Sequence, residues 1–366
     1  MVIKLDLANA FDRVKHEFLF EVMKKFGFDL HFISWIKACI GSPWIAPLVN
    51  GKVSDFFKAS RGLRQGCPLS PLLYAIQASA LSFQLENAQT QKDLMGLRIT
   101  PGVKDINHAQ FADDTLLLGG ASPIIARKFK KELDAYAEAS GSEINLTKSN
   151  IYGWNITPNE MLRITRVLGM EGHTNWDAFR YLGVPIFKAA PRASHWMHLT
   201  EKLKRKFSSW GANWLNLAGK TVLIKAVVAS LPIYQCSLLL APATIIQSIE
   251  AFQRRFLWEG GKQEKKKLHL VKWENATKPY MEGGLNLKNT KTQNLALGAK
   301  ILWKMITGKL TWSKKALWRK YFRGPRERCL ELPSKEVKSS PSFALCKKVI
   351  PLFVPHLTWS RKMARK

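Results

Sequence analysis

The sequence predicts an α+β fold with a split βαβ arrangement, and three observations carry this prediction. The N-terminal stretch MVIKLDL alternates apolar residues with Lys4 and Asp6, which is the pattern of a half-buried strand. Helix start signals stand at Ser70-Pro71 and at Ser122-Pro123, where a capping side chain precedes a proline. Two short apolar strands at 108–120 lie between these helices. The order β-α-β-β-α-β then favours one sheet with its helices on one face.

The remaining elements of the first 90 residues follow from local signals. HEFLFEVMKKFGF, at 16–28, places apolar residues on one helical face and is closed by Gly27. A second helix is expected around FISWIKACI. Asn50-Gly51 joins two apolar stretches and predicts a hairpin. The helix that Ser70 caps is expected to run to about Asn87.

The next elements complete the sheet and lead into a helical region. A helix is expected from Ser122-Pro123 to Ser140-Gly141, followed by one strand over EINLTKSNIYGW. TPNE at 157–160 is a capping box for a helix to about Leu168, and RYLGVPI at 180–186 predicts a short strand pair. From about Ser194 onward the pattern is mainly helical.

Charge divides the chain into two different halves. Of 366 residues, 46% are apolar, which is enough for a substantial core, and the formal net charge is +30. Residues 1–150 hold 18 Lys and Arg against 15 Asp and Glu, whereas residues 151–366 hold 39 against 12. The first part therefore has the balance of an ordinary globular domain, and the second that of a domain that binds a polyanion.

Several classes of protein are disfavoured. The longest apolar stretches, such as SLLLAPATII, are shorter than the roughly 18–20 residues of a membrane span, and the N-terminus lacks the features of a secretory signal. We therefore expect an intracellular protein, nuclear or cytoplasmic, without a membrane partner. The five cysteines are far apart and are expected to be reduced core residues. His195 and His198 have metal-ligand spacing on a helix, but no third ligand is nearby in the sequence.

Asp113 and Asp114 are adjacent carboxylates in the hydrophobic stretch HAQFADDTLLLGG. One interpretation is an ordinary polar hairpin turn. The other is a metal site, because two carboxylates in a partly buried place repel each other unless a cation balances them. In a split βαβ sheet the first strand lies beside the central hairpin, so Asp6 is expected to join the pair. Three converging acids suit two divalent ions about 3.5–4 Å apart that catalyse phosphoryl transfer, and Mg²⁺ is favoured.

Five ordered motifs carry a resemblance to a known family. KLDLANAFDRV, RGLRQGCPLSPLL, FADD, SGSEINLTKS and YLGVPI follow one another over residues 4–186. In this order and at these intervals they resemble the reverse transcriptases of non-LTR, LINE-type retrotransposons, and the helical, Trp-rich remainder is similar to plant members. The resemblance implies a right-hand polymerase with its palm at 1–187, a helical, basic, thumb-like region at 188–260, and a basic, Trp-containing C-terminal region at 261–366.

The resemblance also implies a role for particular residues. Asp6 and Asp113 would be the main metal ligands and Asp114 the third acid, with two Mg²⁺ ions, or Mn²⁺ as a substitute. Phe11 matches the bulky gate that excludes a ribose 2′-hydroxyl, although core packing is the alternative. Gln65 and Gly66 match the family's nucleotide-binding pair, and Lys148 matches a lysine that neutralises or protonates the leaving pyrophosphate. Tyr181, Leu182 and Gly183 match the primer grip. The alternative interpretation is an ordinary turn for Gln65 and Gly66, and an exposed side chain without this role for Lys148.

The basic second half agrees with the partners that the resemblance implies: an RNA template, a DNA primer or RNA–DNA hybrid, and dNTPs. The clusters EKLKRKF, FQRRF and KQEKKK would follow a duplex through its phosphates. Each cluster alone also fits a solvated helix face. Four tryptophans could stack on bases, although core packing is the alternative for them: Trp210, Trp214, Trp258 and Trp273.

Departures from the family pattern leave three hypotheses open. The chain begins five residues before Asp6, so the basic fingers are expected to be absent, as are an endonuclease domain and a Cys/His zinc knuckle. The first hypothesis is an RNA-directed DNA polymerase, in which processive synthesis is expected to be poor. The second is a catalytically inactive remnant that binds RNA or RNA–DNA hybrid. The third is a nuclease with the same two-metal chemistry.

Overall fold

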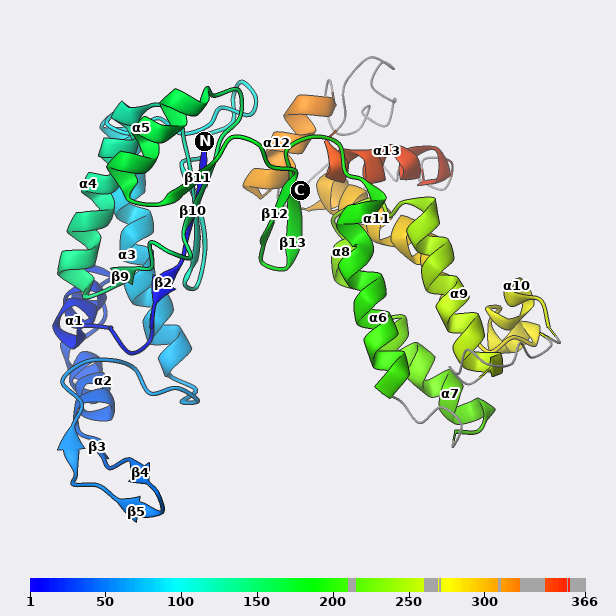
Figure 1. Ribbon diagram of the computed structural model, residues 1–366, viewed down its shortest axis with the longest axis horizontal. Coiled ribbons are helices and arrows are strands. Elements are labelled where there is room, and N and C mark those ends of the chain that lie inside the picture. The colour runs from blue at the N-terminus through cyan, green and yellow to red at the C-terminus, as the bar shows by residue number, and fades with distance from the viewer. Residues whose placement is uncertain are drawn as a thin grey trace, which may run out of the picture. The chain divides into compact units, whose positions relative to one another are not determined.

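The computed structural model describes residues 1–209, 215–259, 269, 271–308, 311–322, 340–353 and 355 (Figure 1). The chain divides into two compact units, Met1–Ile99 with Lys104–Asp177, and Thr100–Val103 with Ala178–Lys366. The strand pair at 178–187, which the sequence places in the palm, thus groups with the second unit. The predicted boundary at 260/261 lies outside the described residues.

The first unit is built on a five-stranded sheet with the order β11-β10-β1-β8-β7. Strand β1 is central and antiparallel to both β8 and β10, whereas β10 and β11 are parallel. The predicted placement of the first strand beside the hairpin is therefore confirmed. The strands of this sheet are β1 (Val2–Leu5), β7 (His108–Phe111), β8 (Asp114–Leu118), β10 (Asn150–Tyr152) and β11 (Glu171–His173).

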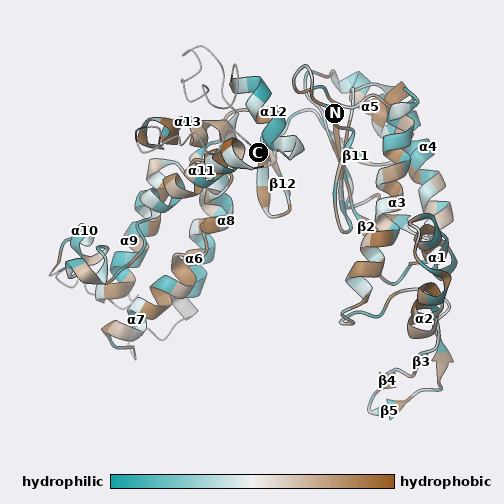
Figure 2. Ribbon diagram, turned by 180° about the vertical axis from the view of Figure 1, so that it is seen from behind, coloured by the Kyte–Doolittle hydropathy of each residue, from teal (hydrophilic) through white to brown (hydrophobic). Residues whose placement is uncertain are grey.

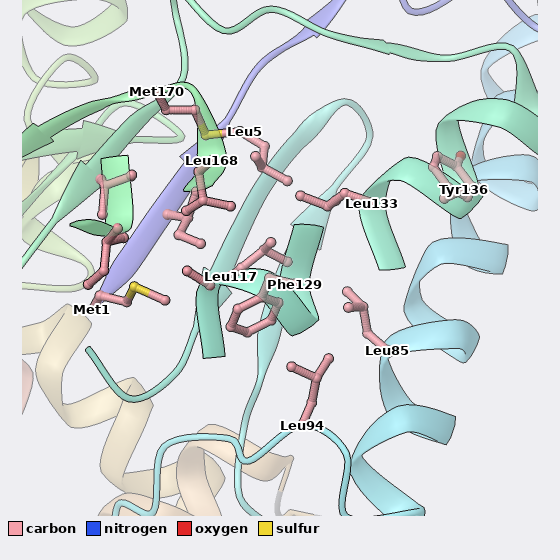
Figure 3. Packing of buried hydrophobic residues seen from close by; sticks show 14 of the residues in the cluster. Met1, Leu5, Leu85, Leu94, Leu117, Phe129, Leu133, Tyr136, Leu168 and Met170 are labelled. Atoms are coloured by element: carbon pink, nitrogen blue, oxygen red, sulfur yellow. The ribbon is translucent and has the colours of Figure 1, made fainter. Parts of the chain in front are cut away.

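Three helices cover one face of this sheet: α3 (Ser70–Thr90), α4 (Pro123–Ser140) and α5 (Pro158–Leu168). Figure 3 shows their apolar side chains in one cluster with those of the strands, with Phe129 next to Leu117. Ile3, Leu117 and Phe129 are fully buried. Each buried side chain of this size contributes about 1.5–3 kcal/mol, so this core anchors the strands that carry the acids.

A second core of the first unit joins helices α1 (His16–Lys25) and α2 (Leu30–Gly41) to α3. Figure 2 shows mostly hydrophobic colour on α2. After α2 the chain forms an exposed ribbon whose turn, at Asn50 and Gly51, has φ of 49° and 79°, as predicted for an Asn-Gly hairpin. The paired short strands are β3 (Trp44–Ile45) with β6 (Phe57–Lys58), β4 (Leu48–Val49) with β5 (Lys52–Val53), and β2 (Leu7–Ala8) with β9 (Glu143–Ile144).

Most local signals act as predicted, and two do not. Ser122 caps α4, Gly141 ends it with φ of 79°, and Thr157 forms the capping box of α5. Ser70, however, does not cap α3, because it is already the first helical residue and its hydroxyl donates to the Arg64 carbonyl at 2.6 Å. The single strand predicted over 143–154 is also wrong, because β9 and β10 are separated by a turn.

The second unit contains the predicted strand pair, β12 (Ala178–Tyr181) and β13 (Val184–Phe187), and its other described residues lie mainly in helices. Its main core contains the fully buried Trp196 and Phe256, and a second core lies around Phe343. The helices are η1 (Ala193–Trp196), α6 (Met197–Ser209), α7 (Leu217–Leu223), η3 (Ile224–Val228), α8 (Ile233–Cys236), α9 (Ala243–Glu259), α10 (Trp273–Ala276), η4 (Tyr280–Glu282), α11 (Thr290–Thr307), α12 (Trp312–Tyr321) and α13 (Pro341–Phe353).

Tryptophan and cysteine positions refine the sequence predictions. Trp258 and Trp273 belong to the main core of the second unit, so the core alternative holds for both, while Trp210 and Trp214 lie outside the described residues. Cys236 and Cys346 are buried, but Cys39 is exposed, so the core assignment is wrong there. Cys329 lies outside the described residues. None of the described helices combines the length and apolar character of a membrane span.

Candidate active site

The acid pair lies at the tip of the β7–β8 hairpin. Phe111 pairs with Asp114 across the hairpin, which leaves Ala112 and Asp113 as the two turn residues. Ala112 has a left-handed φ of 53°, a conformation that lets a two-residue turn close. Asp113 is exposed and Asp114 is half-buried. The turn therefore presents two neighbouring carboxylates at one end of the sheet.

Asp6 lies at the same end of the sheet, directly after β1. In the antiparallel pairing of β1 and β8, Leu5 faces Thr115, so the next residue, Asp6, comes opposite Asp114. Burial raises the pKa of the Asp114 carboxyl, and the negative charges of Asp113 and Asp6 raise it further, although Lys4 acts in the opposite direction. The structure thus brings the three predicted acids into one electrostatic cluster.

The chemistry of this cluster fits a divalent cation. Carboxylate oxygens are hard donors, and among the described residues neither Asp6 nor Asp113 takes part in a salt bridge. Within the part of the chain that the structure describes, no three His, Cys, Asp or Glu side chains already converge in ligand geometry. The three acids are neighbours at one end of the sheet, and a bound cation would relieve the repulsion between their charges.

A turn between β9 and β10 holds the main chain of Asp6 on both sides. The Asn145 N–H donates to the Asp6 carbonyl at 2.8 Å, and the Asp6 N–H donates to the hydroxyl of the fully buried Ser149 at 3.0 Å. The Ser149 N–H donates to the Asn145 carbonyl at 2.9 Å, which closes the turn. Sequence reasoning missed Asn145 and Ser149, because both lie inside the single strand predicted over 143–154, although Asn and Ser are typical of turns.

Lys148 lies on this same turn. Its N–H donates to the Asn145 side-chain oxygen at 3.2 Å, and its carbonyl accepts from the Asn150 side-chain amide at 2.9 Å. Its side chain is exposed. The turn therefore fixes the Lys148 backbone one residue from Ser149, the residue that bonds Asp6, and leaves the ammonium group able to move.

Phe11 packs against the buried Tyr74 of α3. The two rings stack with centroids 4.8 Å apart and planes 19° apart. Burial raises the pKa of Tyr74 above its ordinary range, and the charges of Tyr136 and Asp113 add to this effect. Phe11 is half-buried, so the packing and gate interpretations are compatible.

The loop that carries Gln65 and Gly66 lies against the turn that follows β2. A Cβ on Gly62 would lie 2.8 Å from the Asp12 carbonyl oxygen, so glycine is required for this contact. The Gln65 side-chain amide donates to the Asp12 carboxylate at 3.3 Å. Gly66 has φ of 79°, and apart from its chain neighbours no heavy atom of the described residues lies within 4 Å of where its Cβ would be. The loop is therefore anchored at Gly62 and open at Gly66.

The predicted primer-grip residues form the turn between β12 and β13 in the second unit. Tyr181 pairs with Val184, and the two turn residues, Leu182 and Gly183, have φ of 49° and 76°. The positive φ of Leu182 is a strained conformation for a residue with a side chain. Tyr234 of α8, which sequence reasoning missed, donates its hydroxyl to the Leu182 carbonyl at 2.9 Å and so supports this turn.

Two of the three predicted basic clusters lie on helices of the second unit. EKLKRKF belongs to α6 and FQRRF to α9, and buried Leu203 and Phe256 place these helices in one core. KQEKKK lies outside the described residues. The described basic side chains are thus carried by helices that pack together through their apolar faces.

Comparison with known proteins shows the family. A family model described as reverse transcriptase (RNA-dependent DNA polymerase) matches residues 1–186, half of the chain. The chain belongs to the reverse transcriptase family. The matched residues contain the five-stranded sheet, the acid cluster and the β12–β13 turn, so this reverse transcriptase fold is an α+β palm followed by a mainly helical region.

The relatives confirm the resemblance to non-LTR retrotransposons. A 149 kDa protein of transposon TX1 from Xenopus laevis is 26% identical over 80% of this chain and 21% of its own length. The RNA-directed DNA polymerase of mobile element jockey from Drosophila melanogaster is 24% identical over 62% of this chain and 24% of its own length. A telomerase structure from Candida tropicalis covers 87% of this chain and 53% of its own chain, with 14% identity and a TM-score of 0.40. The chain therefore spans only about a quarter or less of the retrotransposon proteins that it matches.

A plant relative is also present. An uncharacterized mitochondrial protein of Arabidopsis thaliana is 35% identical over 105 residues, which are 29% of this chain and 85% of that protein. This match agrees with the plant-like character expected from the sequence of this reverse transcriptase.

Proposed function

We propose that the chain is an RNA-directed DNA polymerase segment that adds dNTPs to the 3′-hydroxyl of a primer on an RNA template. The observation that carries this proposal is the register of β1 and β8, which places Asp6 opposite Asp114 and beside Asp113 in a reverse transcriptase fold. A cluster of acids at strand ends suits metal-assisted phosphoryl transfer better than any structural purpose, because repulsion alone disfavours it.

In this proposal the three acids hold two Mg²⁺ ions. Such ions, when bound, activate the attacking hydroxyl and stabilise the leaving oxygen of an in-line displacement. The Asn145–Ser149 turn fixes the position of Asp6 through two main-chain hydrogen bonds. Fixed carboxylates reduce the reorganisation that the transition state would otherwise require.

The other predicted residues have complementary roles. Phe11, held on Tyr74, blocks a ribose 2′-hydroxyl. Gln65 and Gly66 lie along the incoming nucleotide, where the open space at Gly66 admits a ligand close to the backbone. The mobile ammonium group of Lys148 neutralises or protonates the leaving pyrophosphate. Tyr181, Leu182 and Gly183 position the primer end.

Primer extension tests this function directly. The chain is incubated with an RNA template, a DNA primer, dNTPs and Mg²⁺, and is compared with the double variant Asp113→Asn, Asp114→Asn. We expect extension to fall at least about 10³-fold in the variant, because several kcal/mol of charge stabilisation is lost. Asp134→Asn on α4, whose carboxylate is largely exposed, is the matched control and should keep activity.

The same reactions separate the alternatives. Binding without extension by the unaltered chain would support a nucleic-acid-binding remnant. Cleavage of the template or primer without dNTPs would support a nuclease. Loss of extension in Asp134→Asn as well as in the double variant would mean that the acid cluster has no special role.

A further inference from the structure

The loop at 61–69, which contains the predicted nucleotide-binding pair, is attached by main-chain hydrogen bonds to the segment that follows β2. The Gly62 N–H donates to the Val14 carbonyl at 2.8 Å, and the Leu63 N–H donates to the Phe11 carbonyl at 2.8 Å. The second bond reaches the residue that is predicted to exclude a ribose 2′-hydroxyl. The loop and the predicted gate are therefore in direct main-chain contact.

One side chain completes this attachment. His16, the first residue of α1, is half-buried, and its Nε2 atom lies 2.7 Å from the Gly62 carbonyl oxygen. Because a carbonyl only accepts hydrogen bonds, Nε2 of His16 carries a proton and is the donor. Both main-chain groups of Gly62 are thus bonded to the segment 14–16.

Apolar packing supports the same contact. Leu63 and Val14 are buried in the core that joins α1, α2 and α3, and the half-buried Phe11 packs against that core. Gly62 has no Cβ, so its backbone can approach the Asp12 carbonyl closely. The start of the loop is therefore positioned by the gate segment, 11–16, from which it is separated by more than 40 residues of chain.

The other end of the loop is fixed on α3. The Ser70 hydroxyl donates to the Arg64 carbonyl at 2.6 Å, and the Ser70 N–H donates to the Cys67 carbonyl at 3.2 Å. Gln65 and Gly66 lie between the two attachments and are exposed. A loop that is held at both ends loses less conformational freedom when a ligand binds, so releasing one end should weaken binding and its selectivity.

We propose that His16 is a positioning residue that fixes the nucleotide loop to the gate segment, and that selection of dNTPs over NTPs depends on its hydrogen bond to Gly62. Without this bond the start of the loop is free to move. Its movement is passed to the gate, because the Leu63 N–H bonds the Phe11 carbonyl. A ring excludes one added hydroxyl only while the ring is held in place. The inference rests on the proposed function, which supplies the nucleotide; His16 itself does not touch it.

Hydrogen–deuterium exchange of the full chain tests the attachment without any substrate. We expect His16→Leu to speed exchange of the Gly62 and Leu63 N–H groups by up to about tenfold, the scale of one hydrogen bond. His16→Gln should keep slow exchange, because the glutamine Nε2 can donate to the same carbonyl. Exchange in α4 is the control for folding. Unchanged exchange at 62–63 in His16→Leu would overturn the proposal.

Steady-state primer extension tests the link to nucleotide selection. We expect His16→Leu to lower the ratio of kcat/KM for dNTPs to that for NTPs about three- to tenfold, and His16→Gln to restore most of this ratio. His31→Leu removes a histidine from the exposed surface of α2 and should leave the ratio unchanged. A lower rate with an unchanged ratio in His16→Leu would mean that His16 serves stability only, which would also overturn the proposal.

A double variant tests whether His16 acts through the gate. Phe11→Val removes the ring that His16 is proposed to hold, so His16→Leu should change the ratio little further in that background. Independent, additive effects of the two substitutions on the ratio would show that His16 does not act through Phe11.

Failure of the proposed function would give a different result. Absence of extension by the unaltered chain, with dNTPs as well as NTPs, would overturn the polymerase function and with it the link to nucleotide selection. Normal extension and normal selection by both the unaltered chain and His16→Leu would overturn the role of His16 alone.

Discussion

Asp114 is a residue whose ionised carboxylate lowers the stability of the fold but suits a metal site. Its carboxyl is half-buried, and the neighbouring charges of Asp113 and Asp6 oppose its ionisation. A hairpin of the same shape would fold without Asp113 and Asp114. The repulsion between these acids lowers stability, so their presence indicates a functional role.

Asp114→Asn is expected to stabilise the chain at pH 7 without divalent cations. The pKa of Asp114 is raised in the folded chain, so folding favours the protonated carboxyl. The contribution of the protonated carboxyl to the free energy of unfolding is fully present below the unfolded pKa, near pH 4, and is lost as the pH rises through the folded pKa. Thermal unfolding should therefore give a higher Tm for the variant at pH 7 and similar values for both proteins at low pH. Mg²⁺ should raise the Tm of the unaltered chain more than that of the variant. A lower Tm for Asp114→Asn at pH 7 without metal would contradict the repulsion.

Phe11→Val is expected to weaken discrimination against ribonucleotides. Valine keeps an apolar contact with Tyr74 but leaves room for a 2′-hydroxyl beyond it. The ratio of kcat/KM for dNTPs to that for NTPs should fall about tenfold or more, the scale on which steric selection operates. The Tm serves as the control for core packing. An unchanged ratio with a lowered Tm would leave Phe11 as a packing residue only.

At the scale of elements, loops and turns position the candidate site more than strands do. The Asn145–Ser149 turn bonds both main-chain groups of Asp6, and the loop at Gly62 lies directly on Asp12. Both segments come from parts of the chain remote from β1. Their contacts explain how a short strand end can hold a carboxylate in place.

Ser149→Ala is expected to lower both stability and primer extension. The Asp6 N–H would lose its acceptor, which costs about 1–3 kcal/mol when the group stays buried. Urea unfolding measures the stability, and steady-state kinetics should show a loss in kcat rather than in KM, because Asp6 is displaced but the nucleotide site is not. Ser149→Thr keeps the hydroxyl and should restore much of the rate. Equal losses in the alanine and threonine variants would argue against the hydrogen bond.

Gly62→Ala and Gly66→Ala are expected to differ in kind. Both residues have positive φ, so each alanine is strained by about 1–2 kcal/mol, but only at Gly62 would the Cβ also meet backbone, at 2.8 Å. Gly62→Ala should therefore lower the free energy of unfolding more. Gly66→Ala should mainly raise KM for dNTPs, since the open space is where we place the nucleotide. A larger loss of stability in Gly66→Ala would reverse this interpretation.

For the whole molecule, most of the excess positive charge lies in the second part of the chain. The acid cluster belongs to the first unit, whereas residues 151–366 carry 39 Lys and Arg against 12 Asp and Glu. A polymerase holds its duplex without reading the sequence, so phosphate contacts should provide most of the affinity.

Binding to an RNA–DNA hybrid is expected to weaken steeply with salt and to depend little on base sequence. If six to ten phosphates are neutralised, the affinity should fall about 10³- to 10⁵-fold between 50 and 200 mM salt. Fluorescence anisotropy with two hybrids of unrelated sequence measures both effects. A shallow salt dependence, or strong preference for one hybrid, would contradict binding through phosphates.

The sequence by itself determined the strands of the acid hairpin, the helices that Ser122 and Thr157 cap, and the acid pair. Ser122, Thr157 and the Asn50-Gly51 turn act on residues at most a few positions away, so their effects can be predicted locally. The ordered motifs likewise identified the family.

Only the tertiary structure decided which residues support the site. Ser149 bonds Asp6 across 143 positions, and Tyr234 bonds Leu182 across 52. Arg180 comes close to His198 only after the hairpin has packed on the helices. Such contacts depend on strand register and on helix packing, which many distant residues set together, and no local pattern carries that information.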